Sequence, residues 1–506
     1  MSSNWESLQP ENDPGIDDQT RSRFLGAWNE HREVYGYTLL AELPYALLTT
    51  LREHPDTKGI DYDLIVVDEY QDLNACDLAL LKHLANHGCS IIAGGDDDQS
   101  IYSFRRAAPE GIRRFTQDYP EAATYPLSMT QRCGSRIIEW ANYVIVGDPD
   151  RPRDRALLQC PQEAEPGEVG LLAFSNQSTE ADGIATLVNN LVNREQNPVP
   201  AREILILLRG DNNGAFSGPI KERLTALSIP VSDPEAIDAI LARPSNRWLL
   251  ELLRLLVDRE DSIAWASLIE LTAGIGDAFV ESIYARAHAG RLRFGAALLA
   301  AHGEGFPDAP AVSRRRALEL VAAVTKWLDE HPLPFDPETQ QQPAWGNWII
   351  QTIVGDDPTV PPPDDELKAL LLKLDSLVEP DTILARYLAQ IRPLGRDLAM
   401  AESAGVRIMS MASAKGLTVQ ATIVAALEQG IMPRPDADLA EERRLLYVAM
   451  TRSRRFLFGT WARRRTGPTA RSGAPRVRMM RSPTSFLQNG PVTTVDGASY
   501  LRTRWP

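Results

Sequence analysis

The sequence lacks a Gly-rich loop ending in Gly-Lys-Ser or Gly-Lys-Thr, because no Gly-Lys pair occurs among its 506 residues. Cysteine and histidine are scarce. The four cysteines show no Cys-x-x-Cys spacing and the seven histidines are scattered, so we expect neither a zinc site nor a disulfide framework. The longest apolar helical stretch, 248–257, is short and interrupted by Glu251 and Arg254. With a polar, acidic N-terminus, this predicts a soluble, cytoplasmic protein without a membrane partner.

Acidic residues outnumber basic ones, giving a formal net charge of −15, which argues against a surface that is basic throughout. The basic residues are unevenly placed: from Arg452 to Arg481 the chain contains many arginines and no Asp or Glu. This stretch is compatible with a phosphate-backbone contact and equally with a solvated basic tail. At this length, with 43% hydrophobic residues, about three domains with sizeable cores are expected.

Acidic and amide side chains follow two apolar segments that are typical of buried strands. The segment 68–72, Asp-Glu-Tyr-Gln-Asp, comes directly after the apolar run 64–67, and a second run closes on the segment 95–102. Parallel strands present their carboxyl ends at one edge of a sheet, so these side chains are predicted to gather there. Nucleotide-driven motors hold magnesium and sense a terminal phosphate in this way. Taken alone, the segment 68–72 is also compatible with an acidic turn.

Three further segments follow in order: 127–132 (Leu-Ser-Met-Thr-Gln-Arg), 410–417 (Ser-Met-Ala-Ser-Ala-Lys-Gly-Leu) and 441–452, which ends in Ala-Met-Thr-Arg. In order and spacing, the five segments resemble the motifs of the UvrD/Rep/PcrA-type superfamily 1 DNA helicases. The resemblance runs from about Trp28 to the segment 482–487. It implies that the C-terminal end is complete, whereas the N-terminal portion with the phosphate-gripping loop is absent.

The resemblance implies roles for five residues in ATP hydrolysis. Asp68 would bind Mg²⁺, and Glu69 would orient or deprotonate the water that attacks the γ-phosphate. Gln99 would sense the γ-phosphate. Arg132 and Arg452 would reach the transferring phosphate, because planar guanidinium groups suit its spread negative charge. Surface salt bridges are the alternative reading of the two arginines.

The same resemblance implies a single-stranded DNA site. Tyr102, Phe104 and Arg105 follow the sensor glutamine, and Phe104 stands where the family more often has tryptophan as a platform for a base. Such stacking contributes about 1–3 kcal/mol per base. Lys415 and Gly416 open a second strand-binding loop, in which glycine would let the backbone approach a phosphate.

Three positions depart from the family pattern. Gln131 stands where a tyrosine usually stacks on adenine, Ala412 where a strand-contacting histidine is common, and Thr418 where a glutamate usually meets the ribose. Each change removes a nucleotide or DNA contact without removing the fold.

The predicted fold class is α/β, with the remnant of one RecA-like motor domain and a second RecA-like domain that carries a helical insertion. The expected boundaries are 1–20 for a disordered leader, 21–150 for the first motor domain, 151–166 for a linker, 167–261 and 400–490 for the second motor domain, 262–399 for the insertion and 491–506 for a tail. Alternating strands and helices are expected to form parallel sheets.

These features predict part of an ATP-dependent 3′-to-5′ DNA helicase or translocase that acts on single-stranded DNA, with ATP and Mg²⁺ as cofactors. A companion chain would have to supply the phosphate-binding loop, and the isolated chain is expected to show little or no ATPase. Two alternatives stay open: a non-hydrolysing DNA-binding or regulatory protein, and a truncated gene product. The pathway, whether repair, recombination or defence, is not predicted.

Overall fold

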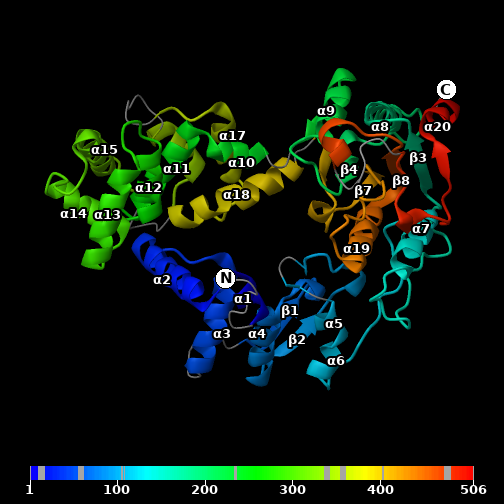
Figure 1. Cartoon of the computed structure of the whole chain (residues 1–506), viewed down its shortest axis with the longest axis horizontal. Helices are drawn as coiled ribbons and strands as arrows, with labels where there is room; N and C mark the ends of the chain where they lie inside the picture. Colours follow the sequence, from blue (N-terminus) through cyan, green and yellow to red (C-terminus); the bar gives the residue numbers. More distant parts are fainter. Residues whose placement is uncertain are drawn as a thin grey trace. The chain divides into compact units, whose positions relative to one another are not determined.

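The computed structural model describes residues 2–8, 17–54, 62–103, 106–107, 109–232, 236–334, 342–353, 361–401, 404–471 and 480–504. The chain divides into two compact units (Figure 1). Unit 1 comprises Met1–Glu11, Leu40–Asp233 and Ser403–Pro506, and unit 2 comprises Asn12–Leu39 and Pro234–Glu402. Unit 1 contains both sheets, and unit 2 is helical.

The first sheet of unit 1 consists of two parallel strands, β1 (Leu64–Val67) and β2 (Ser90–Ala93), with Leu64 opposite Ser90. The helices around them are α1 (Ser2–Ser7), α3 (Leu43–Glu53), α4 (Ala75–Asn86), α5 (Glu110–Arg113) and α6 (Phe115–Asp118). A capping box starts α4, since Asn74 accepts hydrogen bonds from the first turn and Asp77 accepts one from the Asn74 backbone. The sequence of region 109–118 favours a single helix, whereas the structure has the two short helices α5 and α6 there.

One face of the two-stranded sheet is exposed. Its strands alternate between half-buried and exposed residues, and the exposed positions include Leu64 (49%), Val66 (68%) and Ile92 (57%). Among the described residues, β2 pairs only with β1. Apolar runs of this kind are typical of strands covered on both faces, so this part of the fold presents surface that another element would normally cover.

The second sheet of unit 1 is entirely parallel and has the order β5-β6-β4-β7-β8-β3-β9. Its strands are β3 (Glu168–Phe174), β4 (Ile204–Leu208), β5 (Val231–Ser232), β6 (Val406–Ser410), β7 (Val419–Val424), β8 (Ser453–Ala462) and β9 (Thr494–Asp496). The apolar segments 169–174, 204–208, 406–411 and 422–426 of the sequence favour strands, and the structure confirms them as β3, β4, β6 and β7. The sequence interpretation missed β5, β8 and β9. The two parallel sheets confirm the α/β fold class.

Helices cover both faces of the second sheet. They are α7 (Ser135–Val146) and α19 (Leu439–Met450) on one face, and α8 (Gln177–Val192), α9 (Ser217–Ala226) and α20 (Gly497–Arg504) on the other. Along β4, Leu205 and Leu207 pack toward α7 and α19, whereas Ile206 and Leu208 pack toward α8 and α9. Successive side chains of a strand point to opposite faces of the sheet, and on β4 both faces are covered by an apolar core. This explains why the run is apolar at every position.

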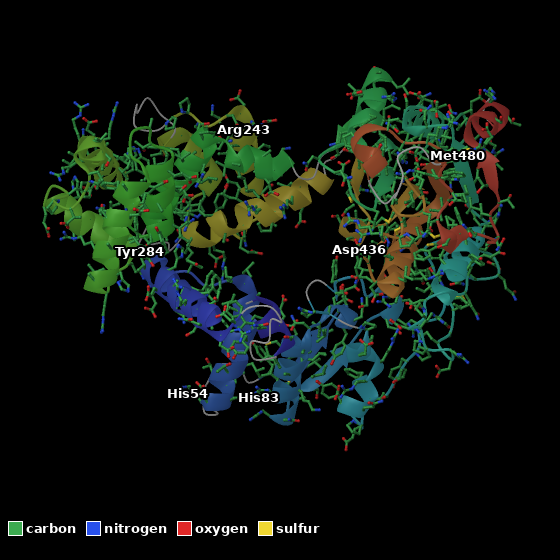
Figure 2. The ribbon with its side chains drawn as sticks, viewed as in Figure 1. His54, His83, Arg243, Tyr284, Asp436 and Met480 are labelled. Atoms are coloured by element: carbon green, nitrogen blue, oxygen red, sulfur yellow. The ribbon has the colours of Figure 1, made fainter. Side chains whose placement is uncertain are left out.

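Unit 2 is built from helices around one apolar core. They are α2 (Asp18–Tyr35), α10 (Ala236–Ala242), α11 (Pro244–Val257), α12 (Ser262–Glu270), α13 (Asp277–Gly290), α14 (Phe294–Gly303), α15 (Ala311–Glu330), α16 (Trp345–Trp348), α17 (Asp365–Leu374) and α18 (Leu384–Ala401). Tyr284 of α13 lies against α2, with its ring centroid 6.1 Å from that of Tyr35 (Figure 2). Tyr35 in turn stacks on Phe294.

Two features differ from the expected organisation at the N-terminal side. Ser2–Ser7 forms helix α1 and packs against α4, where a disordered leader was expected. Helix α2 groups with the helical unit rather than with the sheet that follows it in the sequence, because its aromatic side chains fit the apolar surface of α13 and α14. Among the described residues, no helix has the length and apolarity that crossing a membrane requires.

Candidate nucleotide and DNA site

The predicted catalytic acids lie at the carboxyl end of β1. Asp68 is exposed and accepts a hydrogen bond from the Glu69 backbone N at 2.8 Å. Glu69 has φ = 51°, in the left-handed region that residues with a side chain rarely adopt. Such a conformation costs of order 1–3 kcal/mol and is concentrated at functional sites. The ladder between the strands continues here, since Tyr70 N donates to Gly94 O at 2.9 Å.

Gln71 connects the loops that follow β1 and β2, and it was not assigned to the site from the sequence. Its side chain is fully buried; Oε1 accepts from Asp96 N at 2.9 Å and Nε2 donates to Glu69 Oε2. Gly95 must stay small, because a Cβ there would lie 2.5 Å from Gln71 Oε1. Gln71 therefore holds the candidate base. In the sequence, the position of Gln71 two residues after Glu69, within an otherwise acidic segment, is the feature that could have indicated this role.

Gln99 and Arg452 meet across the space between the two sheets of unit 1. Arg452 Nη2 donates to Gln99 Oε1 at 3.3 Å, and Gln99 Nε2 donates to Asp96 Oδ2 at 2.9 Å. The other hydrogen bonds of Arg452 go to neutral oxygens: Val448 O at 2.8 Å, Thr451 Oγ1 at 3.1 Å and Leu417 O at 3.3 Å. Within the described residues, no carboxylate forms an ion pair with this 1% exposed side chain.

Arg132 lies beside Arg452. It is exposed, and its Nη1 donates to Thr451 O at 3.4 Å. Burial is the main cause that lowers the pKa of Arg452 to about 10, and the nearby positive charge of Arg132 adds to the effect. Arg452 is still charged at neutral pH. Two neighbouring guanidinium groups, one of them buried, form a favourable place for a multiply charged anion such as a phosphate.

Lys415 reaches from the second sheet to the acids of the first. Its Nζ lies 2.6 Å from Asp72 Oδ2, 3.4 Å from Glu69 Oε2 and 3.0 Å from Gln99 O. The side chain is 6% exposed. Asp72 was not assigned to the site from the sequence, and only the tertiary structure brings it to Lys415. Gly416 next to it has φ = 83°, a backbone conformation that favours glycine.

The expected DNA-stacking loop is only partly described. Tyr102 is half-buried; its hydroxyl lies 3.5 Å from Ala412 O, and Lys415 Nζ lies 5.2 Å from its ring centroid. Phe104 and Arg105 lie outside the described residues. The next described contact in this loop joins Ser103 N to Glu441 Oε1 at 3.1 Å.

The chemistry of the site suits Mg²⁺ bound largely through a nucleotide. Among the described residues, no group of three or more His, Cys, Asp or Glu side chains could hold a metal ion. Mg²⁺ commonly keeps several waters and binds one or two carboxylates together with substrate phosphates. The exposed carboxylate of Asp68 fits that mode and would not bind the ion tightly without a phosphate.

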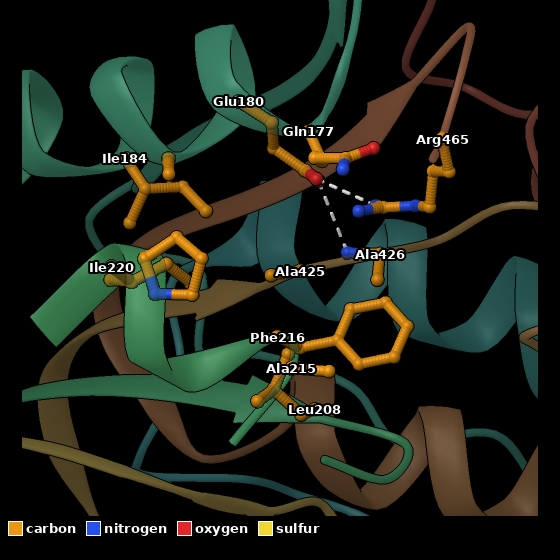
Figure 3. A pocket seen from close by; sticks show the side chains of 12 residues that line it. Gln177, Glu180, Ile184, Leu208, Ala215, Phe216, Ile220, Ala425, Ala426 and Arg465 are labelled. Carbon is orange, nitrogen blue, oxygen red and sulfur yellow. Dashed lines mark hydrogen bonds and ion pairs between the residues drawn. The ribbon is translucent and has the colours of Figure 1, made fainter. Parts of the chain in front are cut away.

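A second polar centre, not predicted from the sequence, lies at the carboxyl edge of the second sheet (Figure 3). Arg465 pairs with Glu180 and with Glu428, each at 2.6 Å, and stacks over Phe216 at 5.1 Å. Burial raises the pKa of Glu428 to about 6, against the opposing effect of Arg465. The adjoining cavity, about 290 Å³ including space open to solvent, is lined mainly by apolar side chains. None of the predicted site residues lies in it.

Comparisons with known proteins agree with the sequence resemblance. The model of the UvrD/REP helicase N-terminal domain matches residues 23–120, and that of the UvrD-like helicase C-terminal domain matches residues 379–464. The ATP-dependent DNA helicase Rep of Buchnera aphidicola subsp. Acyrthosiphon pisum is 24% identical over 81% of this chain and 64% of its own length. The ATP-dependent DNA helicase PcrA of Staphylococcus aureus is 27% identical over 85% and 59%, and DNA helicase II of Escherichia coli K12 is 27% identical over 79% and 56%. The chain spans about three fifths of the length of these relatives.

Proposed function

We propose that this chain, which the matches relate to the UvrD/Rep/PcrA-type helicases, forms part of an ATP-dependent DNA helicase or translocase. It would move 3′ to 5′ along single-stranded DNA. A polypeptide segment outside these 506 residues would supply the phosphate-binding loop, since no Gly-Lys pair occurs within them. The direction of movement follows from the family resemblance alone.

The observation that supports this proposal best is the buried charge of Arg452. Its hydrogen bonds go to neutral oxygens, and Arg132 places a second positive charge beside it. A buried charge without a counter-ion is costly unless a ligand compensates it. A nucleotide γ-phosphate has the matching charge and shape, and Gln99 on the opposite side would report its presence to the loop that contains Tyr102.

Each remaining residue has a role in this proposal. Glu69 would accept a proton from the attacking water, in the orientation that Gln71 holds. Asp68 would hold Mg²⁺, which would neutralise phosphate charge when bound. Tyr102, Phe104, Arg105 and Gly416 are the candidates for contact with the DNA strand.

The test is DNA-stimulated ATPase, measured for the chain alone and together with a polypeptide that carries a Gly-rich-Lys-Ser/Thr loop. The lone chain should turn over little or no ATP, because the β- and γ-phosphates lack their cradle. The combination should turn over ATP and lose that activity with Glu69→Gln. If DNA binding persists and no turnover appears in any combination, the protein is a non-hydrolysing DNA-binding module. Robust turnover by the lone chain would contradict the need for a supplied loop.

A further inference from the structure

We propose that Lys415 is a positioning residue: its ammonium group ties the loop after β1 to the second sheet and orients Glu69, and it does not contact a DNA phosphate. The inference rests on the proposed function for the role of Glu69. The ionic contact of Lys415 with Asp72 and Glu69, called the tie below, can be tested without the proposed function.

The Lys415 ammonium donates two hydrogen bonds, to Asp72 Oδ2 at 2.6 Å and to Gln99 O at 3.0 Å, and it forms an ion pair with Glu69 Oε2 at 3.4 Å. A lysine ammonium has three donors and no acceptor, so these protein oxygens compete with a DNA phosphate for it. The 6% exposed side chain also passes close to the Tyr102 ring, 5.2 Å from its centroid, which limits its access to solvent.

The two carboxylate oxygens of Glu69 have different surroundings and therefore different roles. Gln71 Nε2 and Lys415 Nζ both approach Oε2. Oε1 is therefore the oxygen placed to accept the proton when a water attacks the γ-phosphorus, and the leaving group departs with the electrons of the broken P–O bond. Loss of Lys415 would leave two carboxylates, Asp72 and Glu69, without the cation between them. Their repulsion would turn Glu69 away from this orientation.

Lys415 also joins parts of the chain that are far apart in sequence. It follows β6 and the short helix Ala412–Ala414, whereas Asp72 and Gln99 follow the two strands of the first sheet. Arg452 makes a further contact to the same loops through Gln99, and Arg444 Nε donates to Ser100 O at 2.7 Å. Any change in distance between the two sheets would therefore move the base and the phosphate-binding arginine together, which couples strand contact to hydrolysis.

The first experiment measures the reactivity of Lys415 toward an amine-modifying reagent in the full chain, by peptide mass analysis. We expect slow modification, a several-fold increase in Asp72→Asn, and no further protection by a single-stranded oligo-dT. Lys82 is the control for an exposed lysine, because it is 52% exposed and pairs with Asp118 at 3.3 Å rather than with Asp72 or Glu69. Unchanged reactivity of Lys415 in Asp72→Asn, or strong protection by oligo-dT, would overturn the proposal.

The second experiment compares DNA binding of Lys415→Met and Lys82→Met by fluorescence anisotropy across a salt series. A phosphate contact at Lys415 would lower the slope of log K against log salt by about 0.7 relative to the wild type. The positioning role predicts an unchanged slope for both variants. A loss of slope confined to Lys415→Met would instead assign Lys415 to the DNA.

The third experiment uses the complete ATPase with its phosphate-binding loop. Lys415→Met should lower kcat by tenfold or more while the KM for ATP changes less than about twofold, and Lys415→Arg should restore part of kcat. Added to Glu69→Gln, Lys415→Met should cause no further loss, because Lys415 acts through Glu69. A KM effect alone, or independent losses in the double variant, would contradict the role. If the wild type shows no turnover, the proposed function fails, and the modification experiment still decides whether the tie exists.

Discussion

At the scale of single residues, Arg452 is the most constrained group of the site, because it combines near-complete burial with a positive charge. We predict that Arg452→Lys retains the fold and lowers ATP turnover of the complete system by about 10³-fold, since a point charge cannot span the phosphate oxygens as a guanidinium does. Steady-state ATPase assays measure this. Arg136→Lys, at an exposed arginine, is the control and should turn over normally.

Glu428 makes stability depend on pH. Burial raises its pKa from 4.5 to about 6 in the folded state. Between these values the folded protein holds a proton that the unfolded chain has released, so the free energy of unfolding falls as pH rises from 4.5 to 6. At neutral pH the loss amounts to about 2 kcal/mol. Urea titrations at several pH values measure it.

Glu428→Gln is the variant for that measurement, because its side chain cannot ionise. Its unfolding free energy should change less across the same pH window than that of the wild type. Asp98, whose pKa burial also raises to about 6, contributes to the slope that remains, and Asp98→Asn should reduce it. An identical slope in the wild type and in Glu428→Gln would contradict the assignment.

At the scale of elements, the loop after β2 depends on close packing at Gly95. A Cβ at this position would lie 2.5 Å from Gln71 Oε1, 2.7 Å from Ile112 Cδ1 and 3.2 Å from Tyr70 N. We predict that Gly95→Ala lowers the free energy of unfolding by about 1–3 kcal/mol, because the added methyl group forces its close neighbours to move. Thermal or urea unfolding tests this. Gly218→Ala in α9, where no atom lies within 4 Å of the added Cβ, should cause no loss.

At the scale of the whole molecule, the first sheet is incomplete within the described residues. Ser90 N and Gly94 N donate to the β1 side, to Asp63 O and Val67 O. In a parallel strand alternate amides point to opposite sides, so those of Ile91 and Ala93 point away from β1. Exposed Leu64, Val66 and Ile92 lie on the same two strands. An open apolar edge invites association with another polypeptide.

Hydrogen exchange tests this open edge. We predict that the Ile91 and Ala93 amides of the lone chain exchange at least tenfold faster than the Ile92 amide. They should become protected when a polypeptide supplying the phosphate-loop strand is added, together with a gain in solubility. Strong protection of Ile91 and Ala93 in the lone chain would mean that some element already covers the edge.

The parallel α/β class and most strands of the second sheet follow from the amino-acid sequence alone. Continuous apolar runs such as Ile204–Leu208 are local patterns, and they predict a strand without any knowledge of the distant residues that contact it. The order of the five motifs is also evident in the sequence. The placement of Gln99 opposite Arg452 agrees with the roles expected for them, which stay predictions until activity is measured.

Which groups meet at the site depends on the folding of distant segments onto one another. Lys415 lies 343 residues after Asp72 in the sequence, and their contact depends on the pairing of loops from two different sheets. The left-handed backbone of Glu69 and the buried amide of Gln71 likewise depend on the chain that surrounds them. Helix α2 joins the helical unit for the same reason: the apolar surface it fits comes from residues more than 200 positions later. Local patterns specify strands and helices, whereas such contacts depend on long-range packing, which a single sequence does not display.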